Sequence, residues 1–299
     1  MSIQIDSGTE TALLADCMST PERKLYDPTR FKDAARYYET GRPTYPRLLI
    51  QRVADLVGLS RADNVLDLGT GTGFLALDFA PRARAVTALD PSPEMLAAAS
   101  QNAERSRLRI RLVRSSSYEL GPQLGRFKLV TIGRAFHWMD RAATLQALDA
   151  LLDRGGAVAL FGERYPAVPD NTWHADFQAI IDLYSSEDPA RAQLLDAPTN
   201  EAVLLSSAFS HLERVAVIEV RQTPVERLVD RALSFAATWH GRAGSREDDL
   251  AGEIRRAVSQ HADADGIVRE VLEGHALLAR RPQDLPPHGV REVMEVAER

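Results

Sequence analysis

The 299-residue sequence contains one cysteine, Cys17, and no run of about 18 apolar residues. A single thiol cannot form an internal disulfide bond, and none of the seven histidines lies in a Cys and His cluster with zinc-ligand spacing. Residues 1–20 also lack the basic start and apolar stretch of a secretion signal. We therefore expect a cytoplasmic protein that has no metal site and no membrane partner.

An excess of positive charge is missing as well. The chain has 36 lysines and arginines against 42 aspartates and glutamates, which gives a formal net charge of −6 and a pI near 5.7. Basic runs at 105–114 and 280–281 are short, interrupted by apolar residues and typical of solvated faces. This balance predicts a small-molecule substrate and no nucleic-acid partner, and it leaves the oligomeric state undetermined.

Short apolar segments alternate with segments of helical spacing along most of the chain. The predicted strands are 64–68, 85–90, 109–116, 129–138 with its following loop, 157–163, 214–223 and 276–281. The predicted helices are 29–39, 46–57, 73–81, 91–106, 141–156, 171–185, 224–240 and 246–262. Helix or loop fits the segment from 186 to 209.

This alternation predicts an α/β fold, because parallel strands need helical crossovers. We expect a Rossmann-like, doubly wound, mostly parallel sheet of seven strands. The last strand would be antiparallel, with the helices 224–240 and 246–262 inserted before it as a lid. The expected organisation is a mobile tail at 1–27, a cofactor-binding core with a helical cover at 28–163, and the remaining sheet plus a substrate cap at 164–299. Ligands in such sheets bind beyond the carboxyl ends of the strands.

The segment DLGTGTG places glycines at positions 69, 71 and 73, between the first strand and its helix. Missing side chains let the backbone turn tightly and approach a ligand at the helix N-terminus. Asp90 ends the second strand, where a carboxylate can accept both ribose hydroxyls of an adenosine cofactor. Phe74 stands where a dinucleotide fingerprint needs its third glycine, so a nicotinamide cofactor is disfavoured. The structural alternative is a simple tight turn with Asp90 as a helix cap.

Three motifs, VLDLGTGTG, ALDPSPEML and GRAFHWMD, lie within residues 65–140 and resemble the class I S-adenosylmethionine (SAM)-dependent methyltransferases. The stretch AARYYETGRPTYP is similar to the N-terminal segment of the type 11 subgroup, which includes trans-aconitate and natural-product methyltransferases. The similarity is looser after Glu163. The resemblance implies SAM as cofactor and S-adenosylhomocysteine (SAH) as product.

The resemblance also implies a set of cofactor-binding residues. Asp67 and the glycine turn would flank the methionine part, Asp90 would hold the ribose, and Met95 would pack near the adenine, although Ser92 and Met95 also fit an ordinary helix start and core residue. The full set is Tyr38, Arg42, Asp67, Gly69, Thr70, Gly71, Gly73, Asp90, Pro91, Met95, Ser116, Ser117 and Arg134.

Two residues are candidates for catalysis. Methyl transfer depends mainly on positioning, but an oxygen or nitrogen nucleophile must also lose a proton. His137 follows the fourth strand and Glu163 ends the fifth, so either could act as a base. Alternatively, His137 only holds its loop and Glu163 pairs with Arg164 or caps a turn. Glu163 as a base would suit methylation of an alkene or isoprenoid-type carbon.

Aromatic and basic residues near the predicted loops and lid are candidates for substrate binding: Tyr37, Trp138, Trp173, Trp239, His240 and Arg242. Arginines at 42, 134, 164 and 242 would suit an anionic acceptor, because guanidinium groups bind carboxylates and phosphates. We therefore expect methylation of a small molecule, either a carboxylate or a secondary metabolite, at oxygen, nitrogen or carbon. The competing hypotheses are a nicotinamide oxidoreductase, a SAM-binding protein without transferase activity, and a nucleic-acid methyltransferase.

Overall fold

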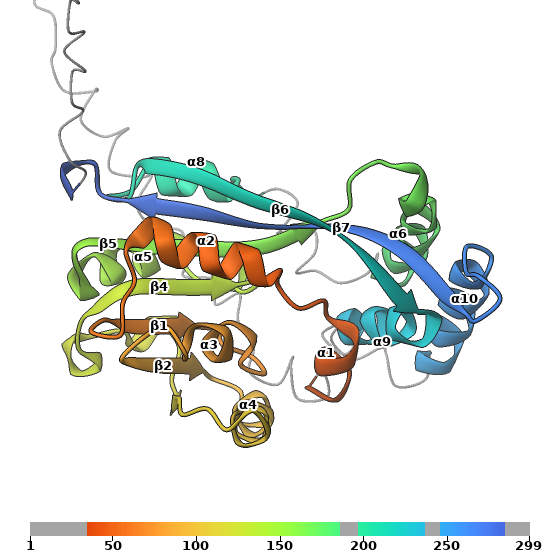
Figure 1. The fold of residues 1–299 in the computed structure, drawn as a ribbon, viewed down its shortest axis with the longest axis horizontal. Helices are drawn as coiled ribbons and strands as arrows, with labels where there is room; N and C mark the ends of the chain where they lie inside the picture. The colour runs from red at the N-terminus through yellow and green to blue at the C-terminus, as the bar shows by residue number, and fades with distance from the viewer. Residues whose placement is uncertain (1–34, 186–196, 237–245, 285–299) are drawn as a thin grey trace, which may run out of the picture.

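The computed structural model describes residues 35–185, 197–236 and 246–284 (Figure 1). Its strands are β1 Asn64–Leu68, β2 Ala85–Asp90, β3 Arg111–Arg114, β4 Phe127–Gly133, β5 Leu152–Arg164, β6 His211–Pro224 and β7 Ile267–Arg280. Its α-helices are α1 Ala35–Gly41, α2 Arg47–Val57, α3 Phe74–Phe79, α4 Pro93–Ser106, α5 Arg141–Leu151, α6 Thr172–Ser185, α8 Asn200–Leu205, α9 Val225–Ala236 and α10 Glu247–Ser259. Short 3-10 helices are η2 Ser117–Glu119, η3 Pro122–Leu124, η4 Phe136–Trp138, η5 Pro169–Asn171 and η6 Pro282–Asp284.

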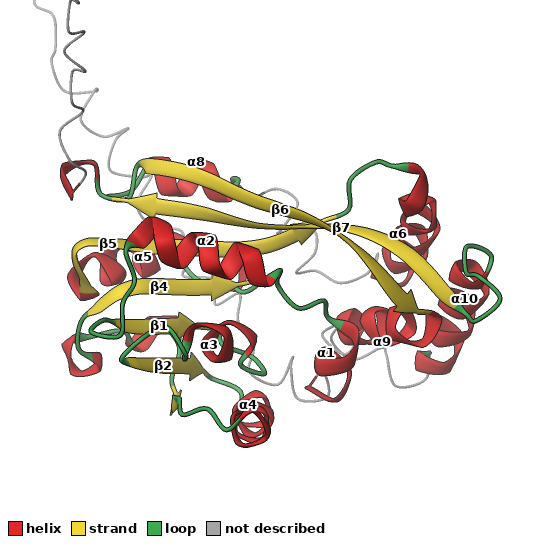
Figure 2. Cartoon of the chain, in the orientation of Figure 1, coloured by secondary structure: helices red, strands yellow, loops and turns green. Residues whose placement is uncertain are grey.

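The seven strands form one sheet in the order β3-β2-β1-β4-β5-β7-β6. Strands β1 to β5 are parallel to one another, whereas β7 is antiparallel to both β5 and β6 (Figure 2). The chain reverses its direction of winding at β1 and β4, and ligands in open α/β sheets bind at such a switch point. The predicted mixed α/β sheet of seven mostly parallel strands is confirmed.

Apolar residues pack on both faces of the sheet, so its central strands are buried on both sides. On one face, α2 and α3 contribute Leu49, Val53 and Phe79 to a core with the strands. On the other face, α5 and the loop before β6 contribute Leu148 and Phe209. The carboxyl edge of this buried sheet positions the loops that follow β1, β2 and β4.

Strands β6 and β7 form a long ribbon that extends past the carboxyl ends of the parallel strands (Figure 1). Helices α9 and α10 connect its two strands, and α6 and α1 pack beside them. Trp173, Leu228 and Ile254 form part of a third apolar core within this helical cluster. The helices expected as a lid thus gather beyond the carboxyl edge of the sheet, and their action as a lid stays a prediction.

Strand β7 begins at Ile267, nine residues before the start that we predicted. Its first half carries Glu270 and Glu273, which break the apolar pattern of a buried strand. Both carboxylates are buried because arginines on other elements pair with them, at Arg231 and Arg164 respectively. Helix α5 also ends earlier than predicted, at Leu151, because β5 already begins at the next residue.

The part of the chain that the structure describes contains no helix that is long and apolar enough to cross a membrane. The same residues include no group of three or more His, Cys, Asp or Glu side chains arranged to hold a metal ion. The tail at 1–27, which contains Cys17, lies outside the described ranges, so its mobility stays a prediction.

Candidate functional site

A hollow of about 650 Å³, its open mouth included, lies at the carboxyl ends of β1, β2 and β4. We call it, together with a smaller adjoining hollow, the carboxyl-end pocket. The larger hollow is lined by Tyr38, Leu68, Gly69, Gly71, Asp90, Pro91, Met95, Ser115, Ser116, Ser117, Tyr118, Gly133, Arg134, Ala135, Trp138 and Met139. The smaller one adds Tyr45, Asp67, Thr70, Phe74 and Leu75. Most of the predicted cofactor residues therefore line one pocket, and Arg42 and Gly73 do not.

The glycine turn is anchored to the end of β2. The amide N–H groups of Gly69 and Thr70 both donate to the Leu89 carbonyl oxygen, each at 2.8 Å. Gly69 has a φ of +70°. A Cβ atom at this position would lie 2.7 Å from that of Ala135. Because a side chain would be strained and would clash, the close approach of the turn to the β4 loop requires glycine here.

Asp90 ends β2 with its carboxylate directed at the glycine turn. Its Oδ2 accepts from the Gly71 N–H at 2.8 Å, and its Oδ1 accepts from the Ser92 N–H at 2.9 Å. Burial raises the pKa of Asp90 to about 6, although these two hydrogen bonds favour the ionised form. The carboxylate lines the pocket, which is the position expected for a ribose-binding acid.

Asp67 holds the glycine turn through buried hydrogen bonds. Its carboxylate accepts from the hydroxyl groups of Thr70 at 2.6 Å and Thr131 at 2.7 Å, and from the Ala76 N–H at 3.2 Å. Burial raises the pKa of Asp67, and the three hydrogen bonds oppose that rise. Asp67 therefore ties the ends of β1 and β4 to the start of α3 and lines only the smaller hollow.

The opposite wall of the pocket comes from α4 and the segment after β3. Met95 is 2% exposed and lines the hollow, so it is a core residue and a pocket residue at once. Ser92 caps α4 by accepting from the Met95 N–H at 3.2 Å, as the alternative interpretation held. Ser116 caps the N-terminus of η2, and its N–H donates to the Glu119 carboxylate at 2.9 Å. These contacts fix the two segments that frame the expected adenine position.

The cover segment, residues 35–47, closes the third side. Tyr38 lines the pocket and stacks on Phe74 at 6.3 Å between ring centroids. Arg42 points elsewhere: its Nε donates to Ser234 Oγ at 2.8 Å, and its guanidinium lies 3.8 Å from the centre of the Phe235 ring. Burial lowers the pKa of Arg42. The structure thus places Arg42 against α9, behind Tyr38, and outside the pocket.

Arg134 and Glu163 form an ion pair between the ends of β4 and β5. Arg134 Nε donates to Glu163 Oε2 at 2.5 Å, and the two side chains are only 10% and 14% exposed. Burial would raise the pKa of Glu163, but the Arg134 charge and hydrogen bond outweigh it and lower that pKa. Arg134 also donates to the Pro43 carbonyl oxygen at 2.5 Å and lies over the Tyr45 ring. The pair therefore binds the cover segment to the sheet.

His137 and Trp138 lie in η4, after β4, with their ring centroids 4.7 Å apart. Trp138 lines the pocket, whereas His137 is not among the lining residues. Glu163 does not pair with Arg164, which instead pairs with Glu273 at 2.7 Å. The roles predicted for His137 and Glu163 as bases therefore stay predictions.

The predicted substrate residues lie in different places. Tyr37 donates to Glu247 at 3.3 Å and packs against the helical cluster. Trp173 has no exposed surface, because it packs against Tyr165 and Phe177 inside that cluster. The remaining residues, Trp239, His240 and Arg242, lie outside the described residues.

Sequence reasoning missed several residues that line the pocket. Ser115, Ala135 and Met139 line the larger hollow, and Tyr45 lines the smaller one. Each stands within two residues of a predicted site residue or in the cover segment. Ser115, Ala135 and Met139 stand at the ends of predicted strands, and Tyr45 lies in the sequence PTYP. These positions were the sequence features that could have identified them.

Most of the residues that line this pocket lie in a segment that matches known proteins. Residues 65–156 match the family described as a methyltransferase domain. An uncharacterized methyltransferase of Mycobacterium tuberculosis is 33% identical over 134 residues, which are 44% of this chain and 50% of the relative. Demethylmenaquinone methyltransferase of Thermus thermophilus is 35% identical over 123 residues, which are 40% of this chain and 54% of that protein. The chain thus spans about half the length of these curated relatives.

One solved structure shares the fold. It is a SAM-dependent methyltransferase of Thiobacillus denitrificans, in complex with SAH, with a TM-score of 0.50 and 14% identity. The alignment covers 84% of this chain and 98% of that protein, and at this identity it shows a common fold. The matched segment, 65–156, contains the glycine turn, Asp90 and Trp138. Residues 65–156 thus match a methyltransferase domain, and the same segment is similar in sequence to proteins named as methyltransferases.

Proposed function

We propose that this chain transfers the methyl group of SAM to a small-molecule acceptor and releases SAH. The observation that carries the proposal is the geometry of Asp90 and the glycine turn. A carboxylate has about four acceptor positions, and the Gly71 and Ser92 amides occupy two of them. Two positions remain on an acid that lines the pocket, which matches the two hydroxyl donors of a ribose.

The pocket arranges the rest of the donor around that anchor. Met95 and Ser116 lie on the side expected for the adenine, and the glycine turn lies on the side expected for the methionine. Tyr38 closes the pocket from the cover segment. Because methyl transfer needs a nucleophile in line with the methyl carbon, these residues would act mainly by positioning and by excluding water.

The acceptor that this site favours is small. Trp138, Met139 and Tyr118 give the pocket an apolar wall, and ligand pockets for small molecules combine such walls with a few polar groups. Two relatives are named demethylmenaquinone methyltransferase and probable cobalt-precorrin-6B C(15)-methyltransferase, and these names support an organic acceptor. A net charge of −6 argues against nucleic acid. We infer a carboxylate or secondary metabolite, methylated at oxygen, nitrogen or carbon.

The ion pair of Glu163 supports a positioning role over a catalytic one. A general base works best with a pKa near the working pH, whereas the pKa of Glu163 is lowered by its arginine partner. Glu163 would hold Arg134 against the Pro43 carbonyl and so keep the cover segment over the donor. Carbon methylation with Glu163 as base has less support than oxygen or nitrogen methylation.

The proposal is tested by incubating the protein with methyl-labelled SAM and a panel of carboxylic acids, phenols, amines and isoprenoid alkenes. Mass spectrometry would then detect an acceptor that gains one labelled methyl group, together with an equal amount of SAH. Trp138→Ala serves as a pocket variant and should lower turnover. If SAH forms with no labelled acceptor across the panel, the enzyme only hydrolyses its cofactor, and transfer to these classes is refuted.

A further inference from the structure

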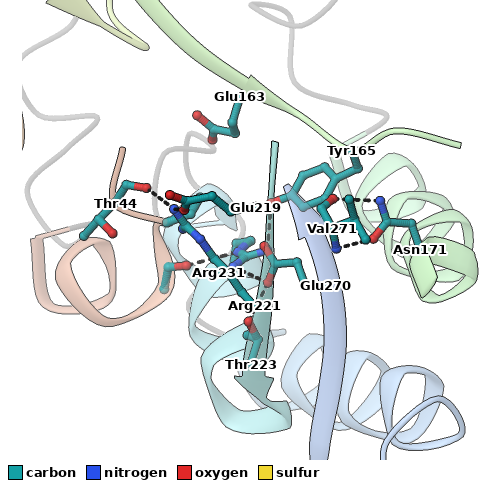
Figure 3. A network of polar contacts seen from close by, with 12 residues as sticks. Thr44, Glu163, Tyr165, Asn171, Glu219, Arg221, Thr223, Arg231, Glu270 and Val271 are labelled. Atoms are coloured by element: carbon teal, nitrogen blue, oxygen red, sulfur yellow. Dashed lines mark hydrogen bonds and ion pairs between the residues drawn. The ribbon is translucent and has the colours of Figure 1, made fainter. Parts of the chain in front are cut away.

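A second cavity lies on the other side of the cover segment from the carboxyl-end pocket. It is an open hollow bordered by the cover loop (residues 40–47), β6, β7 and the start of α9, and its volume, the open mouth included, is about 1020 Å³. On β6 the cavity is lined by Glu219, Arg221 and Thr223, which alternate with the exposed positions 218 and 220, and by Gln222. Figure 3 shows Thr44, Glu219 and Arg221 beside the buried Arg231 and Glu270.

The lining of this cavity is strongly basic. It contains five arginines and two glutamates, at Arg42, Arg47, Arg221, Arg227, Arg231, Glu219 and Glu270. The lining therefore carries an excess of three positive charges in a chain whose formal net charge is −6. Like charges repel when they are gathered in one cavity, so an anion would be attracted to it.

Both glutamates already have arginine partners. Glu219 accepts from Arg221 at 3.0 Å, and the buried Glu270 accepts from Arg231 at 3.2 Å and 3.3 Å. Arg231 is further satisfied by the Tyr165 hydroxyl and the Gly41 carbonyl oxygen (Figure 3). The two acidic groups of the cavity thus pair with two of its five arginines, Arg221 and Arg231. Among the others, the Arg47 charge also acts on the Asp78 carboxylate, outside the cavity lining.

Two of the remaining arginines are available for a ligand. Arg47 begins α2 and Arg227 lies in the first turn of α9, and both are exposed. Within the described parts of the chain, neither has a carboxylate within 4 Å. Arg42 also has no such partner, but its guanidinium is committed to Ser234 and Phe235. Two guanidinium groups on facing elements therefore border one cavity.

Arg221 adds a third, preorganised guanidinium. Its Nη2 donates to the Thr44 carbonyl oxygen at 2.9 Å and to Glu219 at 3.0 Å, so the side chain links β6 to the cover loop and leaves its other N–H groups for a ligand. Guanidinium groups bind carboxylate and phosphate oxygens with paired N–H donors. We propose that the cavity is a binding site for a small, multiply charged anion, phosphate- or carboxylate-bearing, which Arg47, Arg221 and Arg227 hold.

The site is distinct from the donor pocket, so the proposal does not depend on methyl transfer. The experiment is calorimetric titration of the full chain with pyrophosphate and, separately, with citrate, at low ionic strength. The variants are Arg47→Gln, Arg227→Gln and their double variant. Arg52→Gln is the matched control, because Arg52 is exposed on α2 and lies outside the cavity.

Each single variant should weaken anion binding about tenfold, because each removes a charged hydrogen-bond donor. The double variant should weaken it about a hundredfold, and Arg52→Gln should have less than a twofold effect. Binding of pyrophosphate alone identifies a phosphate ligand, and binding of citrate alone identifies a polycarboxylate. The proposal is overturned if the folded wild type binds neither anion, or if the double variant binds as tightly as the wild type. Thermal unfolding of each variant verifies folding.

Discussion

Replacement of Glu163 by glutamine tests how the cover segment is held. In the native protein Arg134 has one carboxylate partner, Glu163, with both side chains at least 86% buried. Glutamine keeps an acceptor oxygen but removes the charge that balances the Arg134 guanidinium. Arg134 would then retain the Pro43 carbonyl oxygen and the Tyr45 ring as its other contacts. The variant therefore isolates the charge of Glu163 with little change of shape.

The expected loss follows from the burial of the pair. Removal of one partner from a buried ion pair costs about 3–5 kcal/mol, and the retained acceptor oxygen places Glu163→Gln near the lower value, about 3 kcal/mol. With an unfolding entropy of about 2.1 cal/mol/K per residue, that loss lowers the Tm of a 299-residue chain by roughly 5 °C. The control is Glu226→Gln, because Glu226 pairs with Arg255 on the surface and should contribute about 1 kcal/mol or less.

The pH dependence of the unfolding free energy tests the Arg134–Glu163 ion pair in a second way. The folded pKa of Glu163 is below its ordinary value of 4.5, so the ionised form stabilises the fold above about pH 4.5. This contribution is lost as the pH falls through the lowered pKa, and Glu163→Gln should lack it. Chemical denaturation at pH 7 and across the acid range measures both effects. If Glu163→Gln unfolds like the wild type at pH 7, the ion pair does not hold the cover segment.

Three further predictions concern the pocket and the cap. Because protonation of Asp90 has a pKa of about 6 and removes a ribose acceptor, SAH affinity measured by calorimetry should fall about tenfold per pH unit below 6; a flat profile would contradict this. Gly69→Ala should lower the unfolding free energy by about 1–3 kcal/mol more than Gly266→Ala, which has a similar φ but open space around it. Arg231→Gln should cost about 3–5 kcal/mol in denaturant, because Glu270 is fully buried, and Arg231→Met/Glu270→Leu should recover most of that loss.

The parallel part of the fold could be predicted because its information is local. Buried parallel strands have nearly continuous apolar runs, and the helices between them have their own spacing and caps, such as Asp140 before α5. The glycine turn and Asp90 belong to the same local pattern, since a strand, a turn and a helix fix their relative positions within a few residues. The family resemblance of residues 65–140 agrees with the matched segment, 65–156.

The features that escaped prediction depend on pairing between distant residues. Glu270 makes the first half of β7 look unlike a buried strand in the sequence. Its partner, Arg231, lies 39 residues earlier on α9, so the sequence pattern does not reveal that the charge is paired. Arg134 meets Glu163 because β4 and β5 are neighbours in register, and a sequence pattern does not contain that register. Trp173 was expected at the substrate because it is aromatic, yet it packs inside the helical cluster. Such contacts become visible only when the sheet order is known.

The central claim is that the carboxyl-end pocket binds the methyl donor through Asp90. Calorimetric titration of the wild type and of Asp90→Asn with SAM and SAH, with NADH as the control ligand, tests it most directly. The account predicts about micromolar binding of both adenosyl ligands, no binding of NADH, and a tenfold to hundredfold loss in Asp90→Asn, because the amide accepts more weakly than the carboxylate. A folded wild type that binds neither SAM nor SAH, or an Asp90→Asn variant that binds them as tightly as the wild type, would contradict it.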